Sequence, residues 1–177
     1  MDFMKKYEYW LNSDSIDEKD KEELRGLKDN PKEIEDRFFK DLSFGTGGIR
    51  GVRGIGTNRI NKYVIRKATQ GLANYMLTFN EKEAKEQGII IAHDCRIGSR
   101  EYALNTARVM AANGIKAYIY EDLRSTPELS FGVRYKGTMA GIVVTASHNP
   151  VEYNGYKVYW NDGAQVVDPH ATLIVDE

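Results

Sequence analysis

Three short segments dominated by apolar residues, in the second half of the chain, predict β-strands, and the first and last of them predict buried ones. They cover residues 88–93, 115–120 and 139–144. Apolar runs of this length are typical of a sheet that is covered on both faces. A helical pattern at about 100–113, which ends at Gly114, separates the first two segments. This strand–helix–strand order predicts parallel strands joined by a right-handed crossover.

Helical spacing of apolar residues marks the elements expected to cover this sheet. The clearest amphipathic pattern is formed by Ile60, Val64, Ala68, Leu72, Met76 and Phe79. It predicts a helix over residues 60–79, and residues 82–87 read as a polar connection after it. Ser99 is expected to cap the helix that follows it, and Ser125 with Pro127 begins another helix.

The first forty residues are rich in charge and predict two or three short helices on the outside of the domain. Ser15 with Glu18, and Asn30 with Pro31, have the spacing of helix starts. Apolar residues at helical spacing follow the second start: Ile34, Phe38 and Leu42. The charged side chains of this segment are expected to form a solvated face.

Residues 153–160 have strand composition, and residues 163–167 are read as one more short strand. The last ten residues show little pattern. Together the elements predict an α/β protein, with a three-layer α/β/α domain around a mixed, mostly parallel sheet. We assign this domain to residues 43–177 and a packed N-terminal helical segment to residues 1–42.

Composition narrows the classes of function. The chain of 177 residues has a net charge of −1 and a pI of about 6.3, which gives no electrostatic case for nucleic acid or an anionic membrane. Its single cysteine, Cys95, excludes an internal disulfide and a cysteine-rich metal site. We see no secretory signal, and no apolar run approaches the ~20 residues of a membrane span. A soluble cytoplasmic protein is therefore expected.

A polar corner with the sequence TASHNP follows the segment 139–144. Asn149 precedes Pro150 and is therefore biased toward extended backbone, so a helix cannot simply start there. The corner holds Ser147 and His148 at a strand end, and a short return connection brings Lys157 back toward them. The alternative interpretation is an ordinary polar turn, because serine, asparagine and proline are all turn residues.

Residues 43–59 read SFGTGGIRGVRGIGTNR and contain six glycines with Arg50, Arg53 and Arg59. Glycine lets backbone amides approach an anion, and arginine offers planar donors that suit phosphate. The segment matches neither a Walker loop nor a dinucleotide fingerprint. A flexible surface loop is the alternative interpretation.

Asp94 and Arg96 follow the segment 88–93, where ligands gather beyond the carboxyl ends of parallel strands. Arg96 is a candidate phosphate contact. Equally open is the alternative that it pairs with Asp94 or braces the neighbouring loop. His93 is more typical of a satisfied strand-end histidine than of a ligand.

Two separate motifs resemble those of the α-D-phosphohexomutases, the phosphoglucomutase and phosphomannomutase family. TASHNP followed by YNGYK is similar to the phosphoserine loop, and GTGGIRG is similar to the N-terminal motif, most closely in the branch of bacterial phosphoglucomutases and phosphoglucomutase-2-like proteins. The resemblance covers roughly residues 43–167. It implies that Ser147 carries a phosphoryl group, that Arg50 lies close to this group and to the phosphosugar, and that His148 and Lys157 are candidates for proton transfer.

The resemblance further implies an intramolecular phosphotransferase that interconverts glucose 1-phosphate and glucose 6-phosphate, with glucose 1,6-bisphosphate as intermediate. A phosphoryl oxygen on Ser147 would bind Mg²⁺. In the family, an Asp-Gly-Asp motif in a second domain supplies the other metal ligands, and third and fourth domains supply sugar specificity and phosphate binding. None of these motifs occurs here, so residues 1–177 are expected to be one domain of about four, to pack against the second domain and to be nearly inactive alone.

Two further interpretations stay open for the activity. The chain is equally compatible with a phosphopentomutase or a phosphomannomutase of the same family, because the sequence lacks the loop that selects the sugar. A non-catalytic phosphosugar-binding module is the alternative from a different class.

Overall fold

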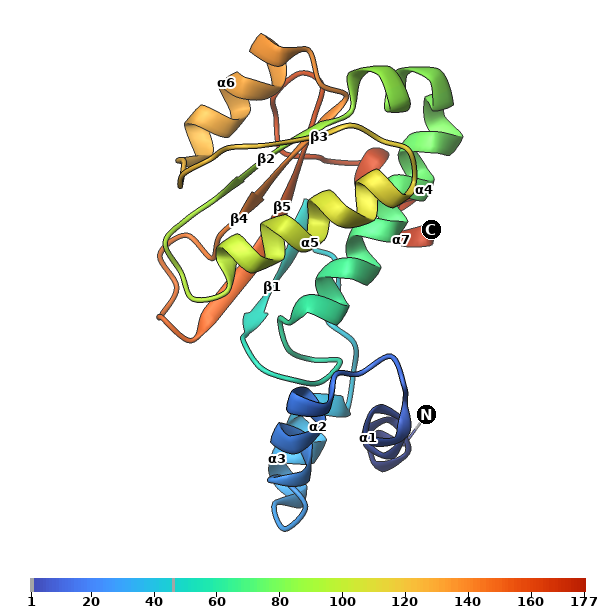
Figure 1. Ribbon diagram of the computed structural model, residues 1–177, viewed down its shortest axis with the longest axis vertical. Coiled ribbons are helices and arrows are strands. Elements are labelled where there is room, and N and C mark those ends of the chain that lie inside the picture. The colour runs from blue at the N-terminus through green and yellow to red at the C-terminus, as the bar shows by residue number, and fades with distance from the viewer. Residues whose placement is uncertain (1, 46) are drawn as a thin grey trace.

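A computed structural model describes residues 2–45 and 47–177 (Figure 1). In chain order the elements are α1 Phe3–Asn12, α2 Glu18–Arg25, α3 Pro31–Phe38, β1 Gly48–Val52, α4 Lys62–Gln87, β2 Ile89–His93, α5 Ser99–Ala112, β3 Ala117–Ile119, α6 Thr126–Lys136, β4 Ala140–Val144, β5 Tyr153–Trp160 and α7 His170–Asp176. Within these described residues no helix combines the length and apolar character needed to cross a membrane.

The strands form one five-stranded sheet in the order β1-β5-β4-β2-β3. Strand β2 is parallel to both β3 and β4, whereas β5 is antiparallel to β4 and β1. Only β5 therefore runs against the other strands of this sheet. The predicted mixed, mostly parallel α/β/α architecture is confirmed.

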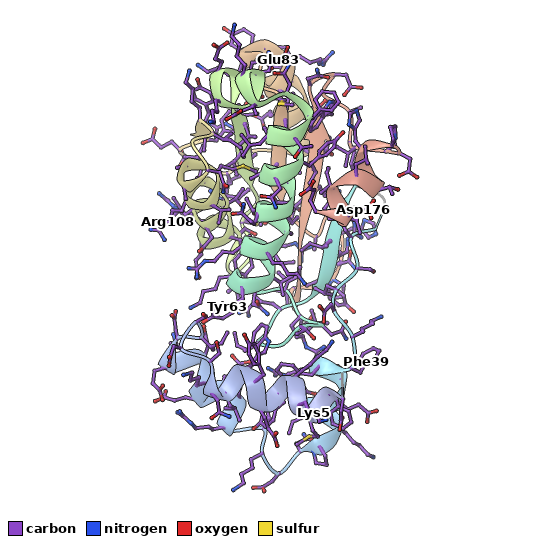
Figure 2. All side chains as sticks on the ribbon, turned by 90° about the vertical axis from the view of Figure 1, so that its right-hand side faces the viewer. Lys5, Phe39, Tyr63, Glu83, Arg108 and Asp176 are labelled. Atoms are coloured by element: carbon purple, nitrogen blue, oxygen red, sulfur yellow. The ribbon has the colours of Figure 1, made fainter. Side chains whose placement is uncertain are left out.

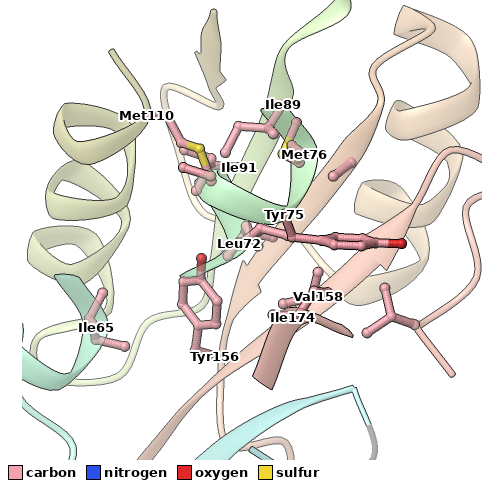
Figure 3. Close-up of a cluster of buried hydrophobic side chains, with 14 of the residues drawn as sticks. Ile65, Leu72, Tyr75, Met76, Ile89, Ile91, Met110, Tyr156, Val158 and Ile174 are labelled. Atoms are coloured by element: carbon pink, nitrogen blue, oxygen red, sulfur yellow. The ribbon is translucent and has the colours of Figure 1, made fainter. Parts of the chain in front are cut away.

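Helices cover both faces of the sheet because the strand residues are apolar on both sides. Ile89 and Ile91 belong to the main core with residues of α4, α5 and α7 (Figure 3). Ile90 lies on the opposite face, where Leu129 and Val133 of α6 pack against it. The predicted burial of the 88–93 and 139–144 segments is confirmed, since every residue of β2 and β4 is buried.

The N-terminal helices have a small core of their own, below the sheet in Figure 2. Phe38 is fully buried there, in edge contact with Tyr7 and Trp10. The segment after β1 contributes to this core, because Ile55 is buried among the same residues. This shared core fixes the N-terminal helices to the domain.

Most charged side chains of these helices are exposed, as expected, and several acidic ones also pair with cations at the junction with the domain. Arg59 is only 7 % exposed and forms ion pairs with Asp36 and Glu33 of α3. Lys62, at the start of α4, likewise pairs with Asp17 and Asp20. The acidic residues thus neutralise cations at the junction with the domain.

Two predicted helix caps are wrong and two are correct. Helix α2 begins after Asp17, so Ser15 is not its cap. Ser99 is the first residue of α5 and is fully buried, and Gly98 takes the cap position with a positive φ of 85°. Asn30 caps α3, and Ser125 forms a full capping box with the helix residue Glu128. Leu42 lies beyond the end of α3 and packs against the main core instead.

Helix α4 is longer than predicted and includes residues 82–87. Asn80 has extended backbone (φ −162°, ψ 94°) and breaks the helix, but its side chain accepts a bond from the Glu83 amide and restarts it. Phe79 is 54 % exposed and joins an aromatic cluster with Trp160, so it is not a core residue as predicted.

The C-terminal predictions also need correction. Residues 163–167 form only an isolated bridge, between Tyr159 and Gln165, instead of a strand. The patternless end of the chain contains helix α7, whose Ile174 is buried in the main core.

We expect Phe38→Ala to destabilise the fold by about 3–5 kcal/mol, because a fully buried aromatic ring is lost. Urea unfolding measures this loss. The matched control is Phe39→Ala, since the neighbouring ring is 51 % exposed and should matter little. Equal losses for the two variants would contradict the structure of this small core.

Candidate active site

Within the glycine–arginine segment, residues 48–52 form strand β1, whereas residues 54–59 form bends and turns. Strand β1 pairs with β5 at the edge of the sheet, with Arg50 opposite Gly155. The glycines permit this close approach. A Cβ on Gly48 would lie 2.1 Å from the Tyr156 carbonyl oxygen, and one on Gly155 would lie 2.7 Å from that of Thr145. Any side chain at either position would push β1 or the Ser147 corner away from β5.

This packing predicts that alanine substitutions at two glycines have very different effects on the free energy of unfolding. Gly155→Ala is expected to cost about 1–3 kcal/mol, because two backbone carbonyls stand within 3.0 Å of the added carbon. Gly45→Ala is the control, since the nearest neighbour of its added carbon would be 3.9 Å away. Urea denaturation of both variants checks this, and a Gly155→Ala protein as stable as the control would contradict the tight strand pairing.

Arg50 and Lys157 lie on the same face of the sheet, the one that carries α6. Lys157 pairs with Val143, which belongs to the α6 face, so the Lys157 side chain lies on that face. Lys157 also pairs with Gly48, and Arg50 lies two residues further along β1, so Arg50 is on the same face. Burial, and secondarily the neighbouring Arg50, lowers the pKa of Lys157. Neither cation forms an ion pair with any described carboxylate. Two adjacent uncompensated cations favour binding of an anion.

The two predicted motifs meet in space. The Arg50 guanidinium donates from Nη1 to Oδ1 of Asn149, at 2.7 Å. Arg50 and Lys157 line a hollow of about 280 Å³, and Ser147 and Asn149 line a second cleft of about 600 Å³. The cleft extends from the carboxyl ends of β2 and β4 to the start of α6.

Ser147 has an unusual backbone conformation for a residue with a side chain. Its φ of 56° lies in the left-handed region. The residue is exposed, and its amide donates to Oγ1 of Thr145 at 2.9 Å. The exposed His148 ring places Nδ1 3.4 Å from the Ser147 Oγ, which is long for a hydrogen bond. Strain of this kind often accompanies a functional group held in a fixed position.

Arg96 braces the Ser147 corner, which favours the interpretation that it supports the loop over the one that it contacts a phosphate. Nη2 donates to the carbonyls of Ser147 (2.9 Å) and Asn149 (2.7 Å). Nη1 donates to the carbonyls of Pro150 (2.8 Å) and Tyr153 (3.1 Å). Nε lies 3.2 Å from Oδ2 of Asp94. Four of the five guanidinium N–H groups therefore bond to loop carbonyls, and the fifth nitrogen, Nε, faces the Asp94 carboxylate.

A family model described as phosphoglucomutase/phosphomannomutase, α/β/α domain I, matches residues 41–177. The chain belongs to this family. It is 46 % identical over 132 residues to the phosphoglucomutase of Staphylococcus haemolyticus, covering 75 % of this chain and 23 % of that protein. It is 43 % identical over 145 residues to the phosphoglucomutase of Staphylococcus aureus strain USA300, covering 81 % and 26 %. The chain thus spans about a quarter of the length of these relatives.

Solved structures of the family share the fold. A Thermus thermophilus protein assigned as a phosphomannomutase superposes with a TM-score of 0.69 at 26 % identity, over 77 % of this chain and 30 % of its own. A phosphoglucomutase of Paramecium, parafusin, superposes with a TM-score of 0.62 at 21 % identity, over 77 % and 26 %. The second similarity supports the fold alone.

Sequence reasoning missed three side chains that support the Ser147 corner. They are Thr145, Ser99 and Asn154, each of which hydrogen-bonds within the network around Asp94. The only available signal was that Thr145 belongs to the same motif as Ser147. His93 behaves as expected, because it is buried and its Nδ1 lies 2.9 Å from the Asp94 carbonyl oxygen.

Proposed function

We propose that this chain is the first domain of a phosphoglucomutase-type enzyme that interconverts glucose 1-phosphate and glucose 6-phosphate. The observation that carries the proposal is the exposed, left-handed Ser147, in a corner whose Asn149 accepts a hydrogen bond from Arg50. Arg50 shares a hollow with Lys157, and no described carboxylate neutralises either cation. The phosphoglucomutase relatives support the choice of substrate. We also propose a cytoplasmic location and packing against a second domain.

The proposed reaction passes one phosphoryl group through Ser147. In the resting enzyme Oγ carries the group. The P–O bond to Oγ breaks as a hydroxyl of the hexose monophosphate forms a new bond to phosphorus and loses its proton. The resulting glucose 1,6-bisphosphate reorients, and its other phosphoryl group returns to Oγ. His148 and Lys157 are the candidates for moving the proton, and burial lowers the pKa of Lys157 from its ordinary value.

Arg50 and Lys157 would stabilise the charge that spreads over the transferred phosphoryl oxygens. Phosphoryl transfer depends mainly on positioning and on electrostatic stabilisation, so fixed cations are its main protein requirement. The hydrogen bond to Asn149 holds Arg50 toward the Ser147 corner. Lys157 is half-buried, which strengthens its interaction with an arriving dianion.

The donor set at this corner fits a partial Mg²⁺ site. A phosphoryl oxygen on the exposed Ser147 is a hard ligand of the type that Mg²⁺ prefers, and the bound ion would supply charge neutralisation. The Asp94 carboxylate is already occupied by Thr145, Ser99 and Arg96. Among the described residues no cluster of three acidic, histidine or cysteine side chains forms a metal site. We propose that the remaining ligands come from the second domain, and that residues 1–177 alone are nearly inactive.

A coupled assay of the full-length enzyme tests this function. With Mg²⁺ and a trace of glucose 1,6-bisphosphate, we expect glucose 1-phosphate to be converted to glucose 6-phosphate. Faster turnover of a pentose or mannose phosphate would assign the chain to another mutase of the family. Binding of phosphosugars without any turnover would favour the non-catalytic module.

A further inference from the structure

The Ser147 corner is held by hydrogen bonds with the side chains of Arg96 and Thr145, which line the same cleft as Ser147. We propose that Arg96 and Thr145, both oriented by Asp94, are positioning residues that fix Ser147 in its left-handed conformation. We call this set the Asp94 clamp. The inference rests on the proposed function of Ser147, but its structural part can be tested without catalysis.

Thr145 links the clamp to the residue that it holds. Its hydroxyl donates to Oδ2 of Asp94 at 2.7 Å, and the same oxygen accepts the Ser147 amide at 2.9 Å. A hydroxyl has one proton and two lone pairs, so it can serve both bonds at once. Valine has the same shape and can serve neither. The hydroxyl therefore links the Asp94 carboxylate to the Ser147 backbone through two hydrogen bonds and restricts the movement of Ser147.

Arg96 holds the other side of Ser147. It grips four carbonyls between Ser147 and Tyr153. Because these acceptors are backbone atoms, the four hydrogen bonds fix the backbone path of the loop independently of its side chains. The guanidinium offers five donors in one plane, whereas a lysine ammonium offers three. A lysine at this position cannot form all four of these hydrogen bonds.

Asp94 is itself anchored from two further elements. Its Oδ1 accepts the Ser99 hydroxyl at 2.6 Å and the Arg96 amide at 3.0 Å. Asn154 of β5 donates to the Ser99 hydroxyl at 2.9 Å. Ser99 and Asn154 are both fully buried. The clamp thus joins β2, α5, β4 and β5, and a hydrogen-bonded network that is partly shielded from solvent in this way holds its members in place.

The clamp is strong enough to maintain the strained residue. The left-handed region is only mildly unfavourable for a residue with a side chain, whereas hydrogen bonds to a charged group are stronger than neutral ones. Arg96 alone makes four such bonds, two of them to the carbonyls of Ser147 and Asn149. Without the clamp, Ser147 is free to adopt a negative φ, which moves Oγ relative to Arg50 and Lys157. A displacement of about 1 Å costs about 100-fold in rate.

The catalytic test compares two substitutions at one position. In the full-length enzyme, Thr145→Val should lower kcat about 100-fold with little change in KM, because positioning is lost and substrate binding is kept. Thr145→Ser keeps the hydroxyl and should retain most of the native kcat. Equal activity of the two variants, or a loss confined to KM, would overturn the clamp as a catalytic device.

The structural test uses hydrogen exchange of the peptide that contains residues 145–150. Exchange should be faster in Thr145→Val and Arg96→Lys than in the native enzyme, and unchanged in Arg100→Lys, an exposed arginine of α5. Unchanged exchange in both clamp variants would overturn the inference. If the native enzyme accepts no phosphoryl group although these variants loosen the loop, the proposed function fails and the clamp stands as a structural device.

Discussion

Replacing Ser147 by glycine is expected to abolish phosphoryl transfer while making the fold slightly more stable. The substitution removes the only atom that we propose accepts the phosphoryl group, so turnover should fall by about 10⁴-fold or more. Glycine adopts the φ of 56° found here without strain. Relief of this strain, less the entropy cost of glycine, should raise the free energy of unfolding by about 0.5–1 kcal/mol. The coupled mutase assay and urea unfolding measure the two effects.

Two outcomes would count against this account of Ser147. Substantial turnover of Ser147→Gly would show that another residue carries the phosphoryl group. A loss of stability would show that the left-handed backbone is not strained. Ser15→Gly is a suitable control, because this serine is exposed and belongs to the N-terminal segment, and neither activity nor stability should rise with it.

Replacing Lys157 by methionine should lower turnover by about 10²–10³-fold, the usual effect of losing one fixed group that stabilises transition-state charge. The same change should stabilise the protein that carries no phosphoryl group on Ser147, at neutral pH. Burial lowers the pKa of Lys157 below its ordinary value of 10.5, so holding the protonated amine costs the folded state free energy. Methionine has a similar length and carries no charge.

The pH dependence of stability gives this prediction a second readout. Because the folded pKa is the lower one, the penalty is complete below it and is relieved as the pH rises toward 10.5. The stability advantage of Lys157→Met should therefore shrink over that alkaline range. Lys28→Met, at an exposed lysine, should show neither effect. An advantage that grows with pH would contradict the assigned direction of the shift.

The central strands could be predicted because their burial is continuous in the sequence. Every residue of β2 and β4 is buried, so the apolar runs indicate them directly. Strand β1 could not be predicted in this way. Glycine and arginine have little preference for strands, and β1 exists because Arg50 and its neighbours pair with β5, far along the chain. Such non-local pairing leaves no local pattern.

The missed helical segments have a similar origin. Residues 82–87 are polar and exposed for the most part, and α4 continues through them because Asn80 restarts the helix after its break. Helix α7 is short, and its buried Ile174 packs on α4. Tertiary packing therefore decides both elements more than local preference does.

At the candidate site, the motifs predicted that the glycine–arginine segment approaches the Ser147 corner but not how the loop is held. The contact between Arg50 and the Ser147 corner is present through Asn149. The direction of the Arg96 side chain could not be predicted, because it depends on a loop that folds around it. The catalytic roles of Ser147, His148 and Lys157 stay predictions.

Mass spectrometry of the full-length enzyme tests the central claim most directly. After incubation with glucose 1,6-bisphosphate and Mg²⁺, digestion should yield the peptide that contains Ser147 with one added phosphoryl group on this serine. The Ser147→Gly enzyme should gain none. A native enzyme that turns over glucose 1-phosphate with no phosphoryl group on Ser147, or with the group on another residue, would contradict the account.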